Sequence, residues 1–157
     1  MHDFFRGLAL FAEFTAPELD KVAELAAIRR FATGELVIHQ GDKPNALFLI
    51  RDGAMRITWL ADDKTHEEVL TVLGAGDTFG ELSLIDQQLP ALSVVAEEPS
   101  VVYAIDHQEL RALMKLDPVI ANKILWSLAR TLVHRLRETN QSLAFARMLI
   151  QQPARES

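Results

Sequence analysis

The sequence contains no cysteine, which excludes disulfide bonds, thiolate zinc sites, iron–sulfur clusters and a cysteine nucleophile. No apolar run approaches the roughly 18 residues that a membrane-spanning helix needs. The first residues carry an acidic side chain, Asp3, and no basic segment ahead of their short apolar stretch, which matches a secretory signal peptide poorly. These absences predict a soluble, cytoplasmic protein that does not associate with membranes.

Basic residues are in the minority. The chain has 16 Lys and Arg against 22 Asp and Glu, which gives a net charge of −6. Because nucleic-acid-binding domains are usually basic, we do not expect direct DNA binding by the bulk of the chain. The 157 residues, 49% of them hydrophobic, have the composition of one ordinary globular domain.

Motifs of catalysis and metal binding are also missing. None of the five histidines lies within four residues of another, so no local metal-binding motif exists. The chain has neither a Gly-x-Ser-x-Gly elbow nor a P-loop. We therefore expect no enzyme, no catalytic residue, no bound metal and no cofactor. His39 and His66 are expected on strand surfaces, and His107 and His134 on exposed helix positions.

The hydrophobic period divides the chain into three parts. Residues 4–26 follow a helical period, and Thr15 with Glu18 resembles a capping box. From about 27 to 106, short apolar runs alternate with turn signals, which is typical of an antiparallel sandwich or roll. From 107 onward the helical period returns. The predicted strands are 36–38, 46–50, 55–60, 69–73, 92–96 and 101–105.

Asp52–Gly53 is the strongest hairpin signal in this middle part. It separates the apolar runs 46–50 and 55–60. Such a dipeptide suits a type I′ turn, which needs positive φ at both central residues. The sequence therefore predicts a hairpin between these two strands.

A long helix is predicted over residues 117–150, with Asp117 as N-cap and Pro118 as its first residue. A short apolar line along it is expected to pack on the roll: Ile120, Ile124 and Leu128. A second line keeps a heptad a/d register, typical of a coiled coil. We expect it to form a homodimer seam, although a helix packed only on its own domain is the alternative. This line is Leu125, Ala129, Leu132, Leu136, Thr139, Leu143, Ala146 and Ile150.

Three segments carry a resemblance to a known family: Phe31-x-x-Gly34-Glu35-x-Val37-x-x-x-Gly41-Asp42, then Leu47-Phe48-x-Ile50-x-x-Gly53, and Gly76-Asp77-x-Phe79-Gly80-Glu81-Leu82-Ser83-Leu84. Together they resemble the cyclic-nucleotide-binding domain of the catabolite-activator and protein-kinase-A regulatory-subunit family. The resemblance implies a mainly β fold with flanking helices: an antiparallel, eight-stranded, jelly-roll-like β-roll with N-terminal helices over 1–116. A dimerisation helix over 117–150 and a tail over 151–157 would follow.

The resemblance also implies a ligand site after Phe79. In the family, the element that corresponds to Gly80, Glu81, Leu82 and Ser83 binds a cyclic phosphate and ribose. Amides at a helix N-terminus suit an anion, glycine allows close approach, and the carboxylate accepts a bond from the ribose 2′-hydroxyl. The implied ligand is cAMP or cGMP. Alternatively, these residues form only a strand end and a helical turn that Glu81 caps.

One feature of the family's pattern is absent. Its ligand-binding members carry an arginine that binds the phosphate, but here Pro90 stands at that position, followed by Ala91 and Leu92. No Lys or Arg occurs between Lys64 and Arg111. A charge-assisted hydrogen bond is worth about 1.5–3 kcal/mol, so its loss weakens binding up to roughly a hundredfold. Arg135 could compensate, or it could be a solvated charge on the long helix.

These observations predict a regulatory or sensory ligand-binding module. It would bind a cyclic nucleotide through a variant phosphate site, or a less anionic small molecule. The alternative is a dimerisation or protein-interaction module with a vestigial or repurposed pocket and an unidentified protein partner. Residues 151–157 are too few for a helix-turn-helix, so we expect a standalone domain without direct DNA binding.

Overall fold

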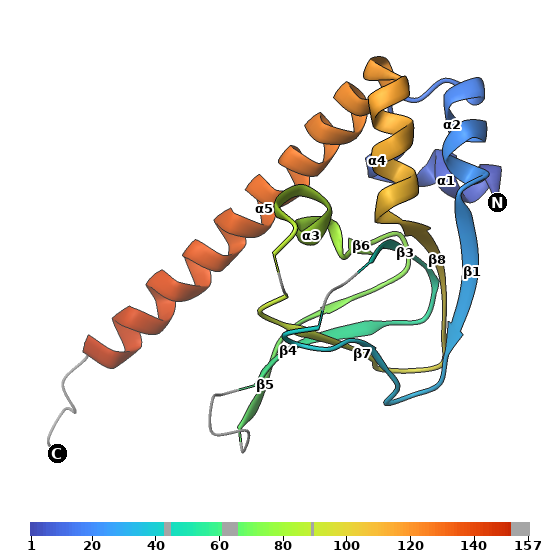
Figure 1. Cartoon of the computed structure of the whole chain (residues 1–157). Helices are drawn as coiled ribbons and strands as arrows, with labels where there is room; N and C mark the ends of the chain where they lie inside the picture. The colour runs from blue at the N-terminus through green and yellow to red at the C-terminus, as the bar shows by residue number, and fades with distance from the viewer. Residues whose placement is uncertain (43–44, 61–65, 89, 152–157) are drawn as a thin grey trace, which may run out of the picture.

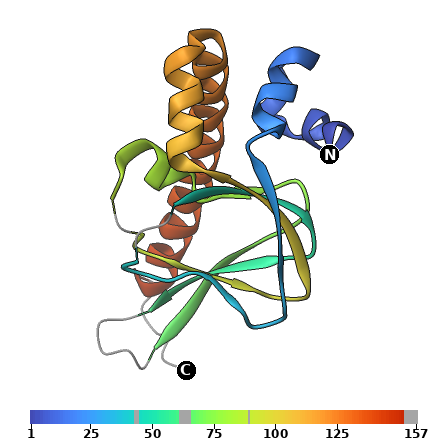
Figure 2. The ribbon, with the colours of Figure 1, turned by 45° about the vertical axis from the view of Figure 1, so that its right-hand side comes forward.

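The computed structural model describes residues 1–42, 45–60, 66–88 and 90–151, without the side chain of Gln151. Two four-stranded antiparallel sheets face each other and are flanked by helices (Figure 1). This arrangement confirms the predicted mainly β, eight-stranded roll. The helices near the N-terminus and α4 gather at one end of the roll, and α5 runs diagonally past it (Figures 1 and 2).

Most strands that follow one another in the sequence belong to different sheets, so the chain passes back and forth between the two. One sheet has the order β1 (Ala26–Phe31), β8 (Ser100–Asp106), β3 (Ala46–Asp52) and β6 (Thr78–Phe79). The other has the order β2 (Leu36–Ile38), β7 (Ser93–Ala96), β4 (Met55–Leu60) and β5 (Glu67–Leu73). Between the sheets lies an apolar core that includes the stacked rings of Phe48 and Phe79, whose centroids are 4.8 Å apart.

The predicted hairpin at Asp52–Gly53 is wrong. β3 pairs with β6 and β8, whereas β4 pairs with β5 and β7, so the turn connects two different sheets. Gly53 has φ +89°, but Asp52 does not have a positive φ. The glycine is needed because the turn passes against Ser100, whose Oγ would lie 2.2 Å from a Cβ added at position 53.

The helical segment predicted over 4–26 is divided. It contains α1 (His2–Gly7), a 3₁₀ turn η1 (Ala9–Phe11) and α2 (Ala16–Ala23). The chain is extended at the two junctions, at Leu8 and at Thr15. The predicted capping box is confirmed: Glu18 accepts a bond from the Thr15 backbone N–H at 2.7 Å, and the reciprocal contact is present. β1 then begins at Ala26, at the end of the predicted helical segment.

Three helices follow or interrupt the strands: α3 (Glu81–Asp86), α4 (His107–Leu116) and α5 (Pro118–Gln151). The long helix is confirmed, and Asp117 accepts a bond from the Ile120 N–H at 3.2 Å. Of the predicted tail, Gln151 belongs to α5 and the remaining residues, 152–157, lie outside the described part. The short apolar line of Ile120, Ile124 and Leu128 is buried against β3, β8, α4 and the N-terminal helices.

Apart from Leu132, which is half-buried, the heptad line of α5 is exposed in the single chain. Leu136 is 59% exposed, and every side chain from 136 to 150 is exposed. The distal half of α5 projects away from the roll (Figure 1). The intramolecular core therefore accounts for the first third of α5 only.

Candidate functional site

The turn between β6 and α3 positions the predicted site. Gly80 lies there with φ +83°, a backbone conformation that residues other than glycine rarely adopt. An added Cβ at Gly80 would lie 2.4 Å from the carbonyl oxygen of Ala46 on β3. Glycine is therefore required both by the backbone conformation and by the close approach of β3.

Glu81, the first residue of α3, is only 1% exposed. Its Oε1 is ion-paired with the guanidinium of Arg135. Its Oε2 has no hydrogen-bond partner among the described residues. Burial raises the pKa of the Glu81 carboxyl, and the nearby Arg135 charge partly opposes this shift. A buried acceptor without a donor is costly, and such a group is often part of a functional site.

Arg135 reaches this carboxylate from α5. Its guanidinium also donates to the backbone carbonyl of Thr78, at 2.5 Å. The Arg135 side chain is 33% exposed. The interpretation of Arg135 as a freely solvated helix charge is therefore wrong. Arg135 therefore links α5 to the β6–α3 turn, and its guanidinium is the positive charge that pairs with Glu81.

Two residues of α4 hold α3 from the other side. His107 was expected on an exposed position, but it is 3% exposed, and its Nε2 lies 3.0 Å from the Gly80 carbonyl oxygen. Arg111 donates to the carbonyl oxygens of Ser83 and Leu84 at 2.8–3.1 Å. Both contacts go to backbone atoms, which have no sequence signature, so the sequence pointed to neither residue.

Among the described contacts, the other predicted site residues form no hydrogen bond with the Glu81 side chain. Phe79 belongs to the core between the sheets, and Leu82 is 55% exposed on α3. Ser83 is buried, and its hydroxyl donates to the Gln88 carbonyl at 3.1 Å. The Pro90 carbonyl accepts a bond from the Gly41 N–H at 2.9 Å. No hydrogen bond of the described residues joins Glu81 to Pro90, Ala91 or Leu92.

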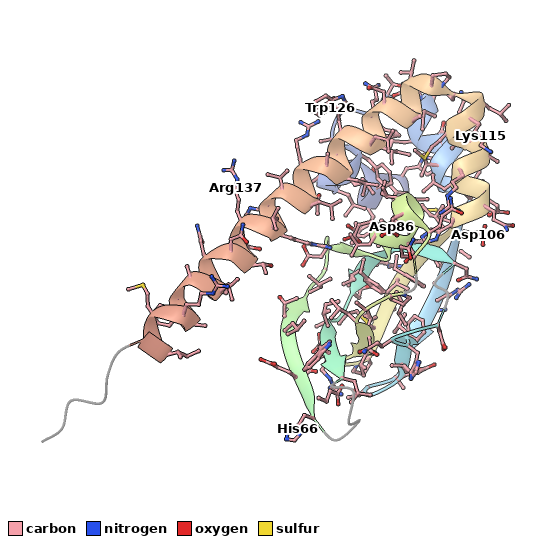
Figure 3. All side chains as sticks on the ribbon, turned by 60° about the vertical axis from the view of Figure 1, so that its left-hand side comes forward. His66, Asp86, Asp106, Lys115, Trp126 and Arg137 are labelled. Atoms are coloured by element: carbon pink, nitrogen blue, oxygen red, sulfur yellow. The ribbon has the colours of Figure 1, made fainter. Side chains whose placement is uncertain are left out.

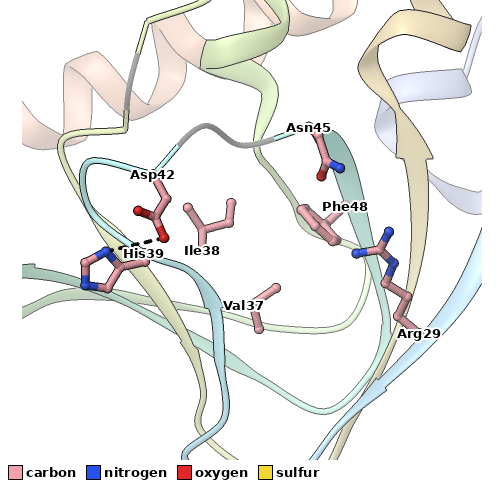
Figure 4. Close-up of a pocket in the computed structure, with 7 residues that line it drawn as sticks. All are labelled: Arg29, Val37, Ile38, His39, Asp42, Asn45 and Phe48. Carbon is pink, nitrogen blue, oxygen red and sulfur yellow. Dashed lines mark ion pairs between the residues drawn. The ribbon is translucent and has the colours of Figure 1, made fainter.

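Two hollows lie near this turn but do not contain the Glu81–Arg135 pair. A polar hollow of about 370 Å³ lies beside the contact of α3 with α4; its lining includes Ser83, His107 and Arg111. A smaller hollow, of about 200 Å³, lies near the start of β3 (Figure 4). In that hollow Arg29 approaches the Phe48 ring, and His39 pairs with Asp42 at 3.6 Å.

In the described part of the chain, no three His, Asp or Glu side chains converge as a metal site. No helix of that part is both long and apolar enough to cross a membrane.

The eight-stranded roll and the Gly80–Glu81 turn agree with the fold and the motif that the sequence resemblance implies. The family model described as "Cyclic nucleotide-binding domain" matches residues 28–117, which is more than half of the sequence. The chain belongs to this family.

Among its relatives is the cyclic AMP receptor protein of Thermus thermophilus, 32% identical over 142 residues. That alignment covers 88% of this chain and 62% of the relative, so this chain spans about three-fifths of the receptor's length. The crystal structure of the Thermus thermophilus catabolite activator protein superposes with a TM-score of 0.73 at 30% identity, covering 88% of this chain and 62% of that one. The N-terminal domain of a Streptomyces coelicolor transcriptional regulator gives 0.72 at 26% identity, covering 90% and 95%.

Proposed function

We propose that the chain is a regulatory module that binds a cyclic purine nucleotide, cAMP or cGMP, at the Glu81–Arg135 pair. The observation that carries this proposal is the buried Glu81 carboxylate, whose Oε2 lacks a hydrogen-bond donor among the described residues. A ribose hydroxyl would supply that donor. The Thermus relative, named as a cyclic AMP receptor, supports a ligand of this class.

Ligand entry would also supply the signal. Arg135 is ion-paired with Oε1 of Glu81, and a ligand that engages both groups would separate the pair. α5 then loses its attachment to the β6–α3 turn and can shift. A second copy of the chain, packed along Leu125, Leu132, Leu136 and Leu143, would sense that shift.

The function is regulatory, and we assign no catalytic residue, cofactor or metal to it. A protein partner of unidentified type would respond to the homodimer in the cytoplasm. Because the chain spans only part of its receptor relative, the other activities of that relative are not assigned to it.

Calorimetric titration of the purified chain with cAMP and with cGMP tests the proposal. A thermal melt at millimolar nucleotide is the second readout, because a ligand at 100 times its Kd adds about 2.7 kcal/mol of stability. For a chain of this size we expect a rise in melting temperature of roughly 5–10 °C. Glu81→Ala should abolish the binding heat. Absence of both heat and shift with either nucleotide contradicts the proposal.

A second candidate is a dimerisation or protein-interaction module that binds no nucleotide. It is favoured by the absence of Lys and Arg between positions 64 and 111 and by the uncovered apolar line of α5. The wild-type titration separates the two candidates, since an interaction module would show no nucleotide heat. In Glu81→Ala, such a module would keep its oligomeric state and its partners.

A further inference from the structure

The Glu81 site receives no positive charge from the segment that surrounds it in sequence. Positions 65–110, which include β6, α3 and residues 90–92, contain neither Lys nor Arg. α3 has six residues, so its aligned peptides add only a small dipole. Arg111 also approaches α3, but it is bonded to the carbonyls of Ser83 and Leu84. A bound anion therefore needs a cation from another element.

Arg135 is placed to be that cation. A guanidinium has five N–H donors, and the described bonds of Arg135 use one toward Glu81 and one toward the Thr78 carbonyl. The described residues take up no further donor of Arg135, and a third of the side chain is exposed. Arginine is also the side chain best suited to a phosphodiester, because its donors form a planar fork.

We propose that Arg135 is the specificity-determining residue of the site and binds the anionic group of the ligand. This inference rests on the proposed function. On binding, Arg135 moves from the Glu81 carboxylate to the ligand's anion, and Glu81 accepts the ligand's hydroxyl instead. The site then holds one cation for the phosphate and one carboxylate for the ribose, although Pro90 supplies no charge.

The exchange of partners selects the ligand class. A ligand with both a hydroxyl and a single negative charge replaces both halves of the Glu81–Arg135 pair. A neutral ligand of the same shape separates the pair without giving Arg135 a new anion. Because the neutral ligand forms no charge-assisted hydrogen bond with Arg135, it should bind more weakly by roughly 10- to 100-fold.

The position of Arg135 also explains how the exchange would reach a second copy. Arg135 lies on α5 next to Leu136 and one turn after Leu132, both on the heptad line. Moving the guanidinium from α3 to a ligand therefore acts within one turn of the proposed seam.

Titration of the wild-type chain with cAMP and with adenosine tests the inference. The two probes share the base and a ribose 2′-hydroxyl but differ in negative charge. We expect cAMP to bind at least tenfold more tightly. Equal affinities overturn the role of Arg135 but leave the nucleotide site in place. If neither probe binds, the same comparison is made with cGMP and guanosine; if none of the four binds, the proposed function fails, and this inference fails with it.

The variant Arg135→Gln should reduce the cAMP-to-adenosine affinity ratio to about one. The matched control is Arg137→Gln, because Arg137 is exposed and points away from the roll (Figure 3); this control should keep the wild-type ratio. A folded Arg135→Gln protein with an unchanged ratio overturns the inference. If that variant does not fold, the wild-type comparison of the two probes still decides.

Discussion

At the scale of single residues, replacing Arg135 and replacing Glu81 should reduce the stability of the folded chain by different amounts. Arg135→Gln leaves a carboxylate that is 1% exposed without its cation, which costs about 3–5 kcal/mol. Glu81→Gln leaves an arginine that is one-third exposed and can be hydrated. We therefore expect this variant to lose only about 1 kcal/mol of stability. Urea unfolding at pH 7 measures both losses.

The pH dependence of these two stability losses gives a further test of the ion pair. Burial raises the folded-state pKa of Glu81 above its unfolded value, so the folded state binds the proton more tightly. The contribution of Glu81 to stability is therefore most favourable below the unfolded pKa and is lost as pH rises through the folded pKa. The deficit of Arg135→Gln should shrink between pH 7 and pH 5, and that of Glu81→Gln should not. Equal losses that do not change with pH would contradict the ion pair.

Gly80 permits a second test at the same scale. Gly80→Ala combines a left-handed backbone conformation with a Cβ 2.4 Å from the Ala46 carbonyl oxygen, and we expect a loss of roughly 2–4 kcal/mol. Gly34 is a matched control, since its φ is +82° and nothing lies within 4 Å of its added Cβ. Gly34→Ala should cost only about 1–2 kcal/mol. Similar urea midpoints for the two variants would show that β3 does not constrain the turn.

At the scale of elements, the sequence predicted those features that depend only on residues close together in the chain. The helix that starts at Pro118 was predictable because a capping residue precedes it and no Gly or Pro interrupts it. The Thr15–Glu18 capping box was predictable for the same reason. By contrast, β6 has two residues, too few for any period. The Asp52–Gly53 turn connects two sheets, and a dipeptide cannot specify with which strands its neighbours pair.

The site was predictable only in part. The family motif located Gly80 and Glu81, and Arg135 was a candidate among several helix charges. Their pairing joins residues 54 positions apart and depends on the path of α5 across the β6–α3 turn. His107 and Arg111 bind backbone carbonyls, so no side-chain pattern could have identified them. The sequence thus contained the residues of the site, but only the packing of α4 and α5 on α3 assigns their contacts.

At the scale of the whole molecule, the uncovered line of α5 predicts a homodimer. A bare apolar stripe of this length is an association hazard for a monomer, and its a/d spacing suits a second helix. Analytical ultracentrifugation should give twice the chain mass for the wild type. Leu136→Glu should raise the dissociation constant roughly a hundredfold or more, because each copy would bury an unpaired carboxylate. Since Leu136 is 59% exposed in the single chain, this variant should keep its melting temperature at a concentration where both proteins are monomeric.

Phe145→Glu is the matched control for this experiment. Phe145 is an exposed apolar residue of the same helix, 64% exposed, but it lies off the heptad line. The Phe145→Glu variant should therefore remain dimeric at concentrations where Leu136→Glu is monomeric. A monomeric wild type would reject the dimer altogether. If Phe145→Glu dissociates while Leu136→Glu remains dimeric, the interface lies on another face of α5, away from residues 132 and 136 and therefore beyond direct reach of the Arg135 exchange.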